Sequence, residues 1–334
     1  MADVEVNRDQ FARTVSADAP VVGRFAPSPS GDLHLGNLRT ALLAWLMARH
    51  AGGRFVMRVE DLDRVQEGAA QRQLEHLAEL GIDWDGEVLY QSQRVDAYLS
   101  EVRSLTNAGL TYECFCTRKE IQAAPSAPHA APGAYPGTCR DLTPAQREAR
   151  RAQRPGAIRL KTTTSRYTVD DYYTGEYTSD VDDFVLVRND GTAAYNLASV
   201  VDDHHQGITQ IVRGDDLLPS APRQAYLANL LGFAAPRYAH VPLALNAQGQ
   251  RLAKRDGAVT LPQLREHGVS DARVMELIAA SIPGRPLSHA GGTRMPHTAA
   301  EMLEVFDPDT ISTEPWVVTD PLKEGTTPFE ETLG

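Results

Sequence analysis

A break in local structure near the N-terminus constrains the fold more than any other stretch of this chain. Val21 and Val22 begin a short β-rich run, and the alternating prolines and serines of 27–30, followed by Gly31, then exclude regular structure. Beyond this point the apolar residues recur with helical spacing, at Leu35, Leu38, Leu42, Trp45 and Leu46. The pattern predicts a strand, a tight loop and the start of a helix.

The expected helix start has the chemistry of a phosphate site. The first turn of a helix presents unpaired N–H groups and a partial positive charge, and both suit a phosphate. Gly36 has no side chain, so a flat base can approach the backbone there, and His34 and Asn37 add side-chain donors. An ordinary strand-to-helix turn is the plainer alternative, which the density of special residues in this loop disfavours.

Composition places the chain among ordinary globular proteins. Its 334 residues are 42% hydrophobic and 23% charged, and no apolar run approaches the ~20 residues needed to span a bilayer. Residues 1–20 are polar and lack the apolar segment of a signal peptide. Three cysteines, an odd number, disfavour a disulfide framework. We therefore expect a cytoplasmic protein without a membrane partner.

The net charge of −11 argues at first against a nucleic-acid partner, but the charge is unevenly distributed. Residues 301–334 hold nine acidic residues and one lysine, so most of the negative charge lies in the tail. Between Arg140 and Arg166, eight arginines and lysines stand against two acidic residues. Such a segment can contact phosphates, although a solvated basic helix has the same composition.

Strands and helices alternate through the N-terminal third. Strand-forming residues occupy 55–59 and end at the charged cluster Glu60–Arg64, while helices are expected over 67–80 and 93–108. Alternation of this kind is typical of a parallel sheet, in which ligands bind at the carboxyl ends of the strands.

The pattern changes beyond residue 166, where we expect antiparallel strands. Asp190-Gly191 is a hairpin signal between Phe184–Arg188 and the run Thr192–Val201. This places Tyr195 on a strand and makes Asp202-Asp203 its polar end, to which we assign no site. Further on, we expect a helix over 222–231, and from Leu261 one or two helices followed by an acidic tail.

Three cysteines indicate a metal site. Cys114, Cys116 and Cys139 lie within 26 residues, around a run rich in alanine, proline and glycine. Two thiolates one residue apart, with a third beyond a loop, can hold a zinc ion once a fourth ligand is present. Tyr135 and His129 are both candidates, and three unrelated buried thiols remain the alternative.

Neither the G-x-x-x-x-G-K-[ST] phosphate loop nor the G-x-G-x-x-G fingerprint occurs in the sequence. The remaining nucleotide-binding features are the loop and helix start described above and the basic cluster Arg251–Arg255, far along the chain. Should both meet over one pocket, they would hold a triphosphate from two sides. That arrangement suits attack on an α-phosphate with pyrophosphate leaving, which needs positioning and charge stabilisation more than a nucleophile.

These segments resemble the class I aminoacyl-tRNA synthetases. His34–Asn37 looks like their HIGH motif and Arg251–Arg255 like their KMSKS loop. Three further runs are similar to glutamyl-tRNA synthetases: Arg24–Gly31, Arg58–Asp63 and Ile211–Leu218. The most similar group is the glutamyl-Q tRNA(Asp) synthetases, which are short paralogues of those enzymes.

The resemblance implies an α/β fold: a Rossmann-like parallel-sheet catalytic domain with a zinc-bearing insert and a short C-terminal helical region. We therefore divide the chain into a polar arm (1–19), a first catalytic half (20–110), an insert with the zinc site and basic segment (111–190), a second catalytic half with the KMSKS-like loop (191–262), and a helical region with an acidic tail (263–334).

The resemblance also implies a reaction. L-glutamate is activated with ATP, which is accompanied by Mg²⁺, and is transferred to the queuosine base in the anticodon of tRNA(Asp); we expect a monomer with one structural zinc ion. Charging of the tRNA 3′ end and an inactive RNA- or metal-binding paralogue are the alternatives. Only 80 residues follow Lys254, which is too few for the helical anticodon-reading region of a full-length glutamyl-tRNA synthetase.

Residue roles follow from the same resemblance. Arg24 and Arg213 would bind a glutamate carboxylate and Glu60 the α-ammonium, because a guanidinium fork matches a carboxylate. The rest of the glutamate pocket would be Ala26, Ser28 and Tyr195. ATP would contact His34, Gly36, Asn37 and Lys254, and of these His34, Asn37 and Lys254 would be catalytic.

The implied zinc ligands are Cys114, Cys116, Tyr135 and Cys139, which favours Tyr135 over His129. For tRNA phosphates we select Arg147, Arg150 and Arg151. The chain departs from the motifs at Asn37, which replaces a histidine and cannot become cationic. Arg251 and Arg255 likewise replace a lysine and a serine in the second motif.

Overall fold

The strand–helix alternation builds a parallel sheet, as predicted. The structure is a computed structural model that describes residues 12–123, 135–246, 248–250, 252, 259–282, 287–289 and 292–318. One sheet contains β1 (Val22–Phe25), β2 (Arg54–Val59) and β3 (Leu89–Tyr90), all parallel. A second has the order β7-β6-β10-β9, formed by Gly175–Asp180, Arg166–Asp171, Arg237–Val241 and Gln210–Gly214. In this second sheet β6 and β7 form an antiparallel hairpin, and the other pairs are parallel.

The two sheets adjoin where β1 meets the start of β9. The backbone N–H of Thr209 donates to the carbonyl of Val22 at 3.0 Å, and the Val22 N–H donates to the Thr209 hydroxyl at 2.8 Å. The two sheets therefore form one continuous central layer. It joins β1 and β2 of the first sheet to β9 and β10 of the second, although these strands are far apart in the sequence.

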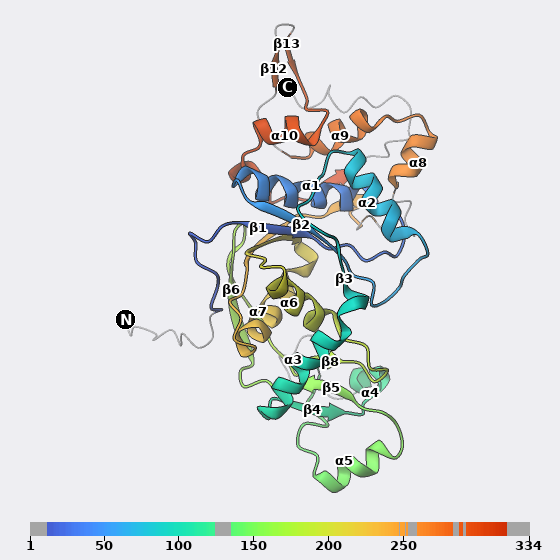
Figure 1. Ribbon diagram of the computed structural model, residues 1–334, viewed down its shortest axis with the longest axis vertical. Helices are drawn as coiled ribbons and strands as arrows, with labels where there is room; N and C mark the ends of the chain where they lie inside the picture. The colour runs from blue at the N-terminus through green and yellow to red at the C-terminus, as the bar shows by residue number, and fades with distance from the viewer. Residues whose placement is uncertain are drawn as a thin grey trace.

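Helices cover both faces of this layer (Figure 1). α1 (Leu35–His50) lies between the sheet and the C-terminal helices, which explains why eleven of its 16 residues are buried. α2 (Ala69–Glu79) packs on the same side. On the opposite face lie α3 (Val95–Asn107), α6 (Tyr195–His205) and α7 (Ala221–Leu230), which share a second hydrophobic core.

The structure corrects the prediction of a strand over Thr192–Val201. The Asp190-Gly191 turn is present, with the Arg188 N–H donating to the Thr192 carbonyl at 2.9 Å, but α6 begins only three residues later. Every residue from Leu197 to Asp203 is buried. A helix that is packed on several sides lacks the solvent-facing polar stripe that marks an amphipathic helix in a sequence. Its β-branched residues Val200 and Val201 therefore have the pattern of a buried strand.

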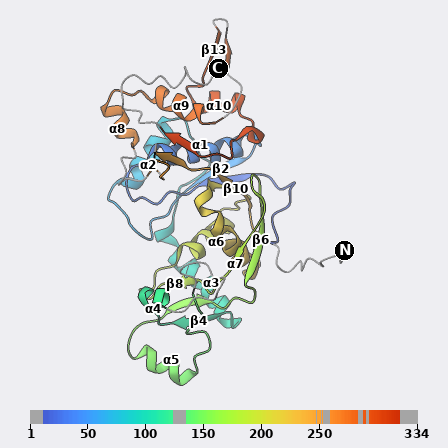
Figure 2. The same ribbon diagram turned by 180° about the vertical axis from the view of Figure 1, so that it is seen from behind.

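The cysteine-containing segment forms a small antiparallel sheet at one end of the molecule (Figure 1). Its order is β4-β5-β8, formed by Thr111–Cys114, Ala157–Leu160 and Val185–Val187. Two short helices accompany it, α4 (Arg118–Ala123) and α5 (Pro144–Arg151). Figure 2 shows from behind that this sheet and the C-terminal helices lie at opposite ends of the central layer.

The C-terminal region contains more structure than predicted. The described part holds three helices rather than one or two: α8 (Leu261–Glu266), α9 (Asp271–Ala280) and α10 (Ala299–Val305). Two small sheets join them, one pairing β11 (Ala244–Asn246) with β14 (Trp316–Val318), the other pairing β12 (Leu287–His289) with β13 (Gly292–Arg294).

The first half of the expected acidic tail belongs to the core. Met302, Phe306 and Ile311 are each at most 6% exposed and pack in the same cluster as α1. At the other end of the chain, the described part of the N-terminal arm is bound along its backbone, where Val15 donates to the Ala235 carbonyl at 2.9 Å. Among the described residues, no helix has the length and apolar character needed to cross a membrane.

Candidate active site

Two buried arginines and one aspartate form the floor of the site. Arg24 on β1 and Arg58 on β2 are 5% and 0% exposed. In the parallel register Arg24 lies beside Val56, so Arg58, two residues further along, projects to the same face of the sheet. Both guanidinium groups reach Oδ1 of Asp203 on α6, at 3.5 Å from Arg24 Nε and 2.8 Å from Arg58 Nη1.

Glu60 adds a second carboxylate where β2 ends. Its Oε1 lies 3.5 Å from Nη2 of Arg58 and accepts a hydrogen bond from the Ser199 hydroxyl at 3.3 Å. Ser199 lies one helical turn before Asp203 on α6, so a single helix face supplies both contacts. The side chain of Glu60 is 12% exposed, whereas that of Asp203 is 7% exposed.

Burial and pairing act in opposite directions on these groups. Burial alone would raise the pKa of Asp203, but Arg58 and Arg24 hold it below the ordinary value. For Glu60 burial prevails, and its pKa is raised although Arg58 and Arg24 partly offset the effect. Burial would lower the pKa of Arg58, but Asp203 and Glu60 outweigh it and shift the pKa upward. The arginine on β1, Arg24, has a lowered pKa because burial outweighs Asp203.

A third buried arginine, Arg213 on β9, has uncharged partners. It is 4% exposed and donates to His240 Nε2 at 3.0 Å and to Gln224 Oε1 at 2.8 Å. The hydroxyl of Tyr195 accepts a longer hydrogen bond, at 3.4 Å. Within the described residues, no ion pair is recorded between Arg213 and a carboxylate, including those of its near neighbours Asp215 and Asp216.

Arg24 and Arg58 thus share the carboxylate of Asp203, whereas Arg213 has no carboxylate in direct contact within the described residues, since Asp171 reaches it only through His240. A carboxylate of a ligand can pair with this guanidinium directly, because a guanidinium fork matches a carboxylate. An amino acid with an acidic side chain offers such a group.

The loop after β1 brings the remaining pocket residues to the carboxyl end of the sheet. Ala26 and Ser28 are half-buried, and the carbonyl between them, on Pro27, accepts the Glu60 N–H at 3.0 Å. Gln73 on α2 holds the loop in place by donating a hydrogen bond to the carbonyl of Ser28 at 3.2 Å. Tyr195 opens α6 at the rim and is 40% exposed.

The predicted helix start is present, with His34 as its N-cap. Its Nδ1 accepts the Asn37 N–H at 3.3 Å, and Asn37 Oδ1 accepts the His34 N–H at 3.4 Å, which completes a capping box. A Cβ on Gly36 would lie 3.1 Å from that of Ala244, so glycine permits a close approach there. This contact supports the idea that the two nucleotide motifs meet.

Segments flanking the basic cluster reach the same helix start. The Leu35 N–H donates to the Val259 carbonyl at 3.3 Å, and His34 pairs with Thr260. On the N-terminal side of the cluster, Ala244 lies against Gly36, and its carbonyl accepts the N–H of Leu252, inside the cluster, at 3.2 Å. Lys254, Arg251 and Arg255 lie outside the described residues, so their assigned roles stay predictions.

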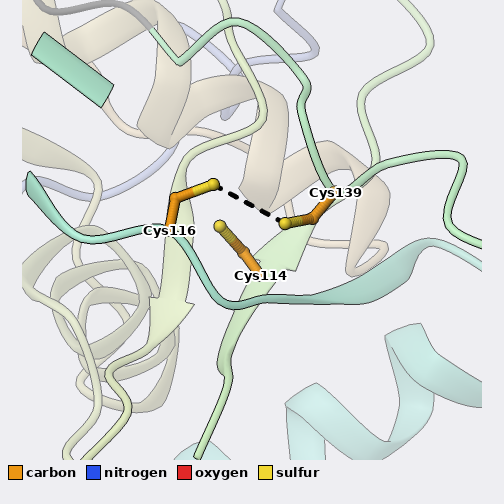
Figure 3. Close-up of side chains that lie close together, drawn as sticks. All are labelled: Cys114, Cys116 and Cys139. Atoms are coloured by element: carbon orange, nitrogen blue, oxygen red, sulfur yellow. Dashed lines mark hydrogen bonds between the residues drawn. The ribbon is translucent and has the colours of Figure 1, made fainter. Parts of the chain in front are cut away.

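The three cysteines come together as the sequence predicts (Figure 3). Their sulfur atoms all lie within 4.8 Å of one another, and Cys116 and Cys139 are 3.6 Å apart. Tyr135 is 8% exposed, and its hydroxyl lies 3.3 Å from the sulfur of Cys114 and 3.9 Å from that of Cys116. The other candidate ligand, His129, lies outside the described residues.

The individual separations of 3.3, 3.6 and 3.9 Å lie close to the edges of a zinc tetrahedron. Zn–S bonds of ~2.3 Å and Zn–O bonds of ~2.0 Å give edges of roughly 3.5–3.8 Å. Arg159 lies 3.7 Å from the centre of the Tyr135 ring. The pKa of the Cys114 thiol is lowered: burial opposes the shift, but the Tyr135 hydroxyl and Arg159 prevail. The four side chains thus fit a closed tetrahedral site.

The three candidate tRNA-binding arginines lie on α5 but differ in their surroundings. Arg151 donates from Nε and Nη2 to the carboxylate of Glu113, and from Nη1 to that of Glu148 at 2.9 Å. Arg147 is half-buried and donates to the Leu142 carbonyl at 3.3 Å. Arg150 is exposed, and no ion pair to it is recorded within the described residues.

Comparison with known proteins identifies the family of this chain. The family model of the class I tRNA synthetase catalytic domain (E and Q) matches residues 20–317. A glutamyl-Q tRNA(Asp) synthetase of Nocardia farcinica is 58% identical over 306 residues, covering 90% of this chain and 95% of that protein. One from Deinococcus radiodurans is 47% identical over 274 residues, covering 79% and 89%.

A solved structure shows the same architecture. The glutamate tRNA ligase of Elizabethkingia meningosepticum in complex with its amino acid superposes with a TM-score of 0.73 at 29% identity. The match covers 90% of this chain and 67% of that one.

The chain belongs to the class I tRNA synthetases of the E and Q type, ATP-dependent ligases that activate glutamate and transfer it to tRNA. Within this class it is a member of the glutamyl-Q tRNA(Asp) synthetase family. The α/β class I catalytic fold expected from the sequence is confirmed.

Several residues that organise the site were not predicted from the sequence. Asp203 was interpreted as the polar end of a strand, but it lies on the buried face of α6. Arg58 and His240 were given no role, although both are polar residues inside apolar strand runs. A polar side chain in a buried strand requires a hydrogen-bond or ion-pair partner. This requirement is the signal that could have identified Arg58 and His240.

We expect Asp203→Asn to lower the free energy of unfolding at pH 7 by about 3–5 kcal/mol, because it leaves Arg24 and Arg58 without their shared carboxylate. The folded-state pKa of Asp203 lies below the ordinary value of 3.8. Its contribution is therefore present above that value and is lost as the pH falls through the folded-state pKa. Urea unfolding at pH 7, 5, 4 and 3 measures this trend.

The matched control is Asp96→Asn, on the exposed side of α3, which should change stability little at any of these pH values. Equal stability of Asp203→Asn and the wild type at pH 7 would contradict the role assigned to the buried carboxylate.

Proposed function

We propose that this chain activates L-glutamate with ATP and transfers it to the queuosine base of tRNA(Asp). The observation that carries the first half of the proposal is the buried cluster of three arginines with Glu60, in which Arg213 has no carboxylate in direct contact within the described residues. Arg24 and Arg213 hold the substrate carboxylates, and Glu60 receives the α-ammonium. Ala26, Ser28 and Tyr195 line the pocket around them.

ATP lies over the N-terminus of α1 in this proposal. His34, Gly36 and Asn37 present the helix start to the nucleotide, and backbone N–H groups there suit its phosphates. Lys254 approaches from the KMSKS-like loop and stabilises the charge that develops on the phosphates, with Mg²⁺ accompanying ATP. The contacts between α1 and the two flanks of that loop support this arrangement.

Activation needs no tRNA if these residues are sufficient. Glutamate-dependent exchange between pyrophosphate and ATP should be measurable with the protein alone. Lys254→Ala should lower the exchange rate at least ~100-fold, the scale of losing one preorganised charge stabiliser. A suitable control is Lys119→Ala on α4, which belongs to the insert and should leave exchange unchanged. Absence of exchange by the wild type in every tRNA-free condition would overturn this part.

The cysteine cluster holds one structural zinc ion in our proposal. Cys114, Cys116, Cys139 and Tyr135 complete the coordination, so the bound ion contributes folding energy to the insert and keeps no open position for catalysis. The reaction itself uses the residues of the central sheet. Loss of the ion should therefore affect activation less than it affects the insert.

Elemental analysis of protein purified without chelator should give one zinc per chain. Cys114→Ser should release the ion and increase proteolysis of the insert while activation partly survives. Tyr135→Phe keeps the aromatic ring under Arg159 but removes the oxygen ligand, so it should lose zinc to a chelator faster than the wild type. Substoichiometric zinc in all wild-type preparations would rule the site out.

The acceptor is an anticodon base, according to this proposal. All tRNAs have the same 3′ end, so an enzyme charging it usually verifies the tRNA elsewhere. A modified base in a loop is itself distinctive and can be splayed out and recognised by stacking and hydrogen bonds. The family names support this acceptor: two of the most similar relatives are named for tRNA(Asp).

Nuclease mapping of tRNA labelled with glutamate tests the acceptor directly. We expect the label on an anticodon fragment, and no label on tRNA from cells that cannot make queuosine. Label on the 3′-terminal adenosine, or equal labelling of queuosine-free tRNA, would favour ordinary glutamyl-tRNA synthesis instead.

The same assay examines the basic helix α5. Replacing Arg147, Arg150 and Arg151 by alanine should weaken tRNA glutamylation and spare tRNA-free activation, because phosphate contacts position the tRNA without taking part in chemistry. We expect most of the effect from Arg150, since Arg151 is already paired with Glu113 and Glu148.

A further inference from the structure

A buried row of three side chains leads from the β6–β7 hairpin to the glutamate site. Nδ1 of His240 lies 2.6 Å from Oδ2 of Asp171, and its Nε2 accepts a hydrogen bond from Nε of Arg213 at 3.0 Å. The side chains of both Asp171 and His240 are 0% exposed. His240 contacts Arg213 through Nε, whereas Tyr195 contacts the same guanidinium through Nη1 at 3.4 Å.

The partners of His240 fix the position of its proton. A guanidinium group only donates hydrogen bonds, so Nε2 must be the unprotonated nitrogen and Nδ1 must carry the hydrogen. Nδ1–H then donates to the Asp171 carboxylate. Burial lowers the pKa of His240, and the hydrogen bond to Asp171 opposes this shift only in part. The ring therefore stays uncharged near neutral pH.

Asp171 is itself held rigidly. Its Oδ1 accepts the backbone N–H groups of Tyr173 and Thr174, both at 3.1 Å, and its Oδ2 accepts that of His240 at 3.0 Å. With the ring N–H, four donors converge on one carboxylate. These hydrogen bonds and His240 keep the pKa of Asp171 lowered although burial opposes the shift. The carboxylate thus fixes the ring orientation.

We propose that His240 is a positioning residue for glutamate binding, which Asp171 locks as the Nδ1–H tautomer so that its Nε2 orients Arg213 without neutralising it. The proposal rests on the proposed role of Arg213 in holding a substrate carboxylate. A carboxylate in the place of His240 would orient Arg213 equally well, but it would cancel the charge that the substrate requires. Gln224 and Tyr195 are uncharged acceptors of the same kind.

Two substitutions separate the functions of the two ring nitrogens. His240→Gln places an amide oxygen near the position of Nε2, and it keeps an acceptor for Arg213. His240→Asn retains a donor near Nδ1 for Asp171, and it removes that acceptor. A merely structural histidine would not distinguish the two variants by the affinity for glutamate.

The measurement is pyrophosphate–ATP exchange with glutamate and ATP varied in turn. We expect His240→Asn to raise the KM for glutamate at least ~10-fold with little change in kcat or in the KM for ATP, since a hydrogen bond to a charged group is lost. His240→Gln should stay within ~3-fold of the wild type. His205→Asn, on the exposed end of α6, is the control and should match the wild type.

The outcomes separate this inference from the proposed function. A wild-type protein that never activates glutamate would overturn the proposed function itself. An active wild type with equal KM for glutamate in the Asn and Gln variants would overturn the role of His240. If the Asn variant does not fold, the ring ¹⁵N chemical shifts of the wild type test the tautomer of His240 directly. We expect a neutral ring protonated at Nδ1, and any other state contradicts the proposal.

Discussion

The shared carboxylate of Asp203 is the interaction on which the rest of the site depends. Arg24 and Arg58 come from neighbouring parallel strands and project to one face, where two guanidinium groups would repel each other without a counter-ion. Burying them is tolerable only because α6 supplies a carboxylate between them. The two arginines can therefore stay buried and charged only when α6 packs on the sheet and brings Asp203 between them.

The topology explains why a helix so late in the sequence provides this group. Between β3 and α6 the chain forms the insert strands β4 and β5, adds the β6–β7 hairpin to the second sheet of the central layer, and passes through β8 of the insert sheet. After β8, α6 packs beside α3 and α7, and its Ser199 and Asp203 meet both β2 and β1. An insertion of this size leaves the site intact because its two ends lie against the same sheet.

Most predictions from local signals are confirmed, whereas the buried ion pairs between distant residues were not predicted. The loop and helix after β1 follow from spacing, glycine and a capping residue, and the cysteine cluster follows from ligand type and separation. The identity of α6 was hidden because Val200 and Val201, after a hairpin signal, favour a strand. Nothing near Asp203 in the sequence points to Arg24, which is 179 residues away.

Stability of the insert shows the same dependence on polar partners. One buried cluster of the insert contains Tyr112, Cys114, Phe115, Tyr135 and Cys139, so the proposed zinc ligands make up most of that cluster, whereas Leu160 and Leu186 belong to the second hydrophobic core. A core of this size gives little hydrophobic stabilisation by itself. Asp183 provides a second attachment, since it accepts hydrogen bonds from Arg140, Tyr112 and the Thr162 backbone.

Asp183 and the cysteine cluster hold the same turn before α5 through separate contacts. The aspartate joins Tyr112 on β4 to Arg140 in that turn and to Thr162 beyond α5. Cys114, Cys116 and Tyr135 bring the end of β4 to Cys139, which directly precedes Arg140. Loss of the proposed zinc ion would therefore leave this turn attached to β4 through Arg140 and Asp183.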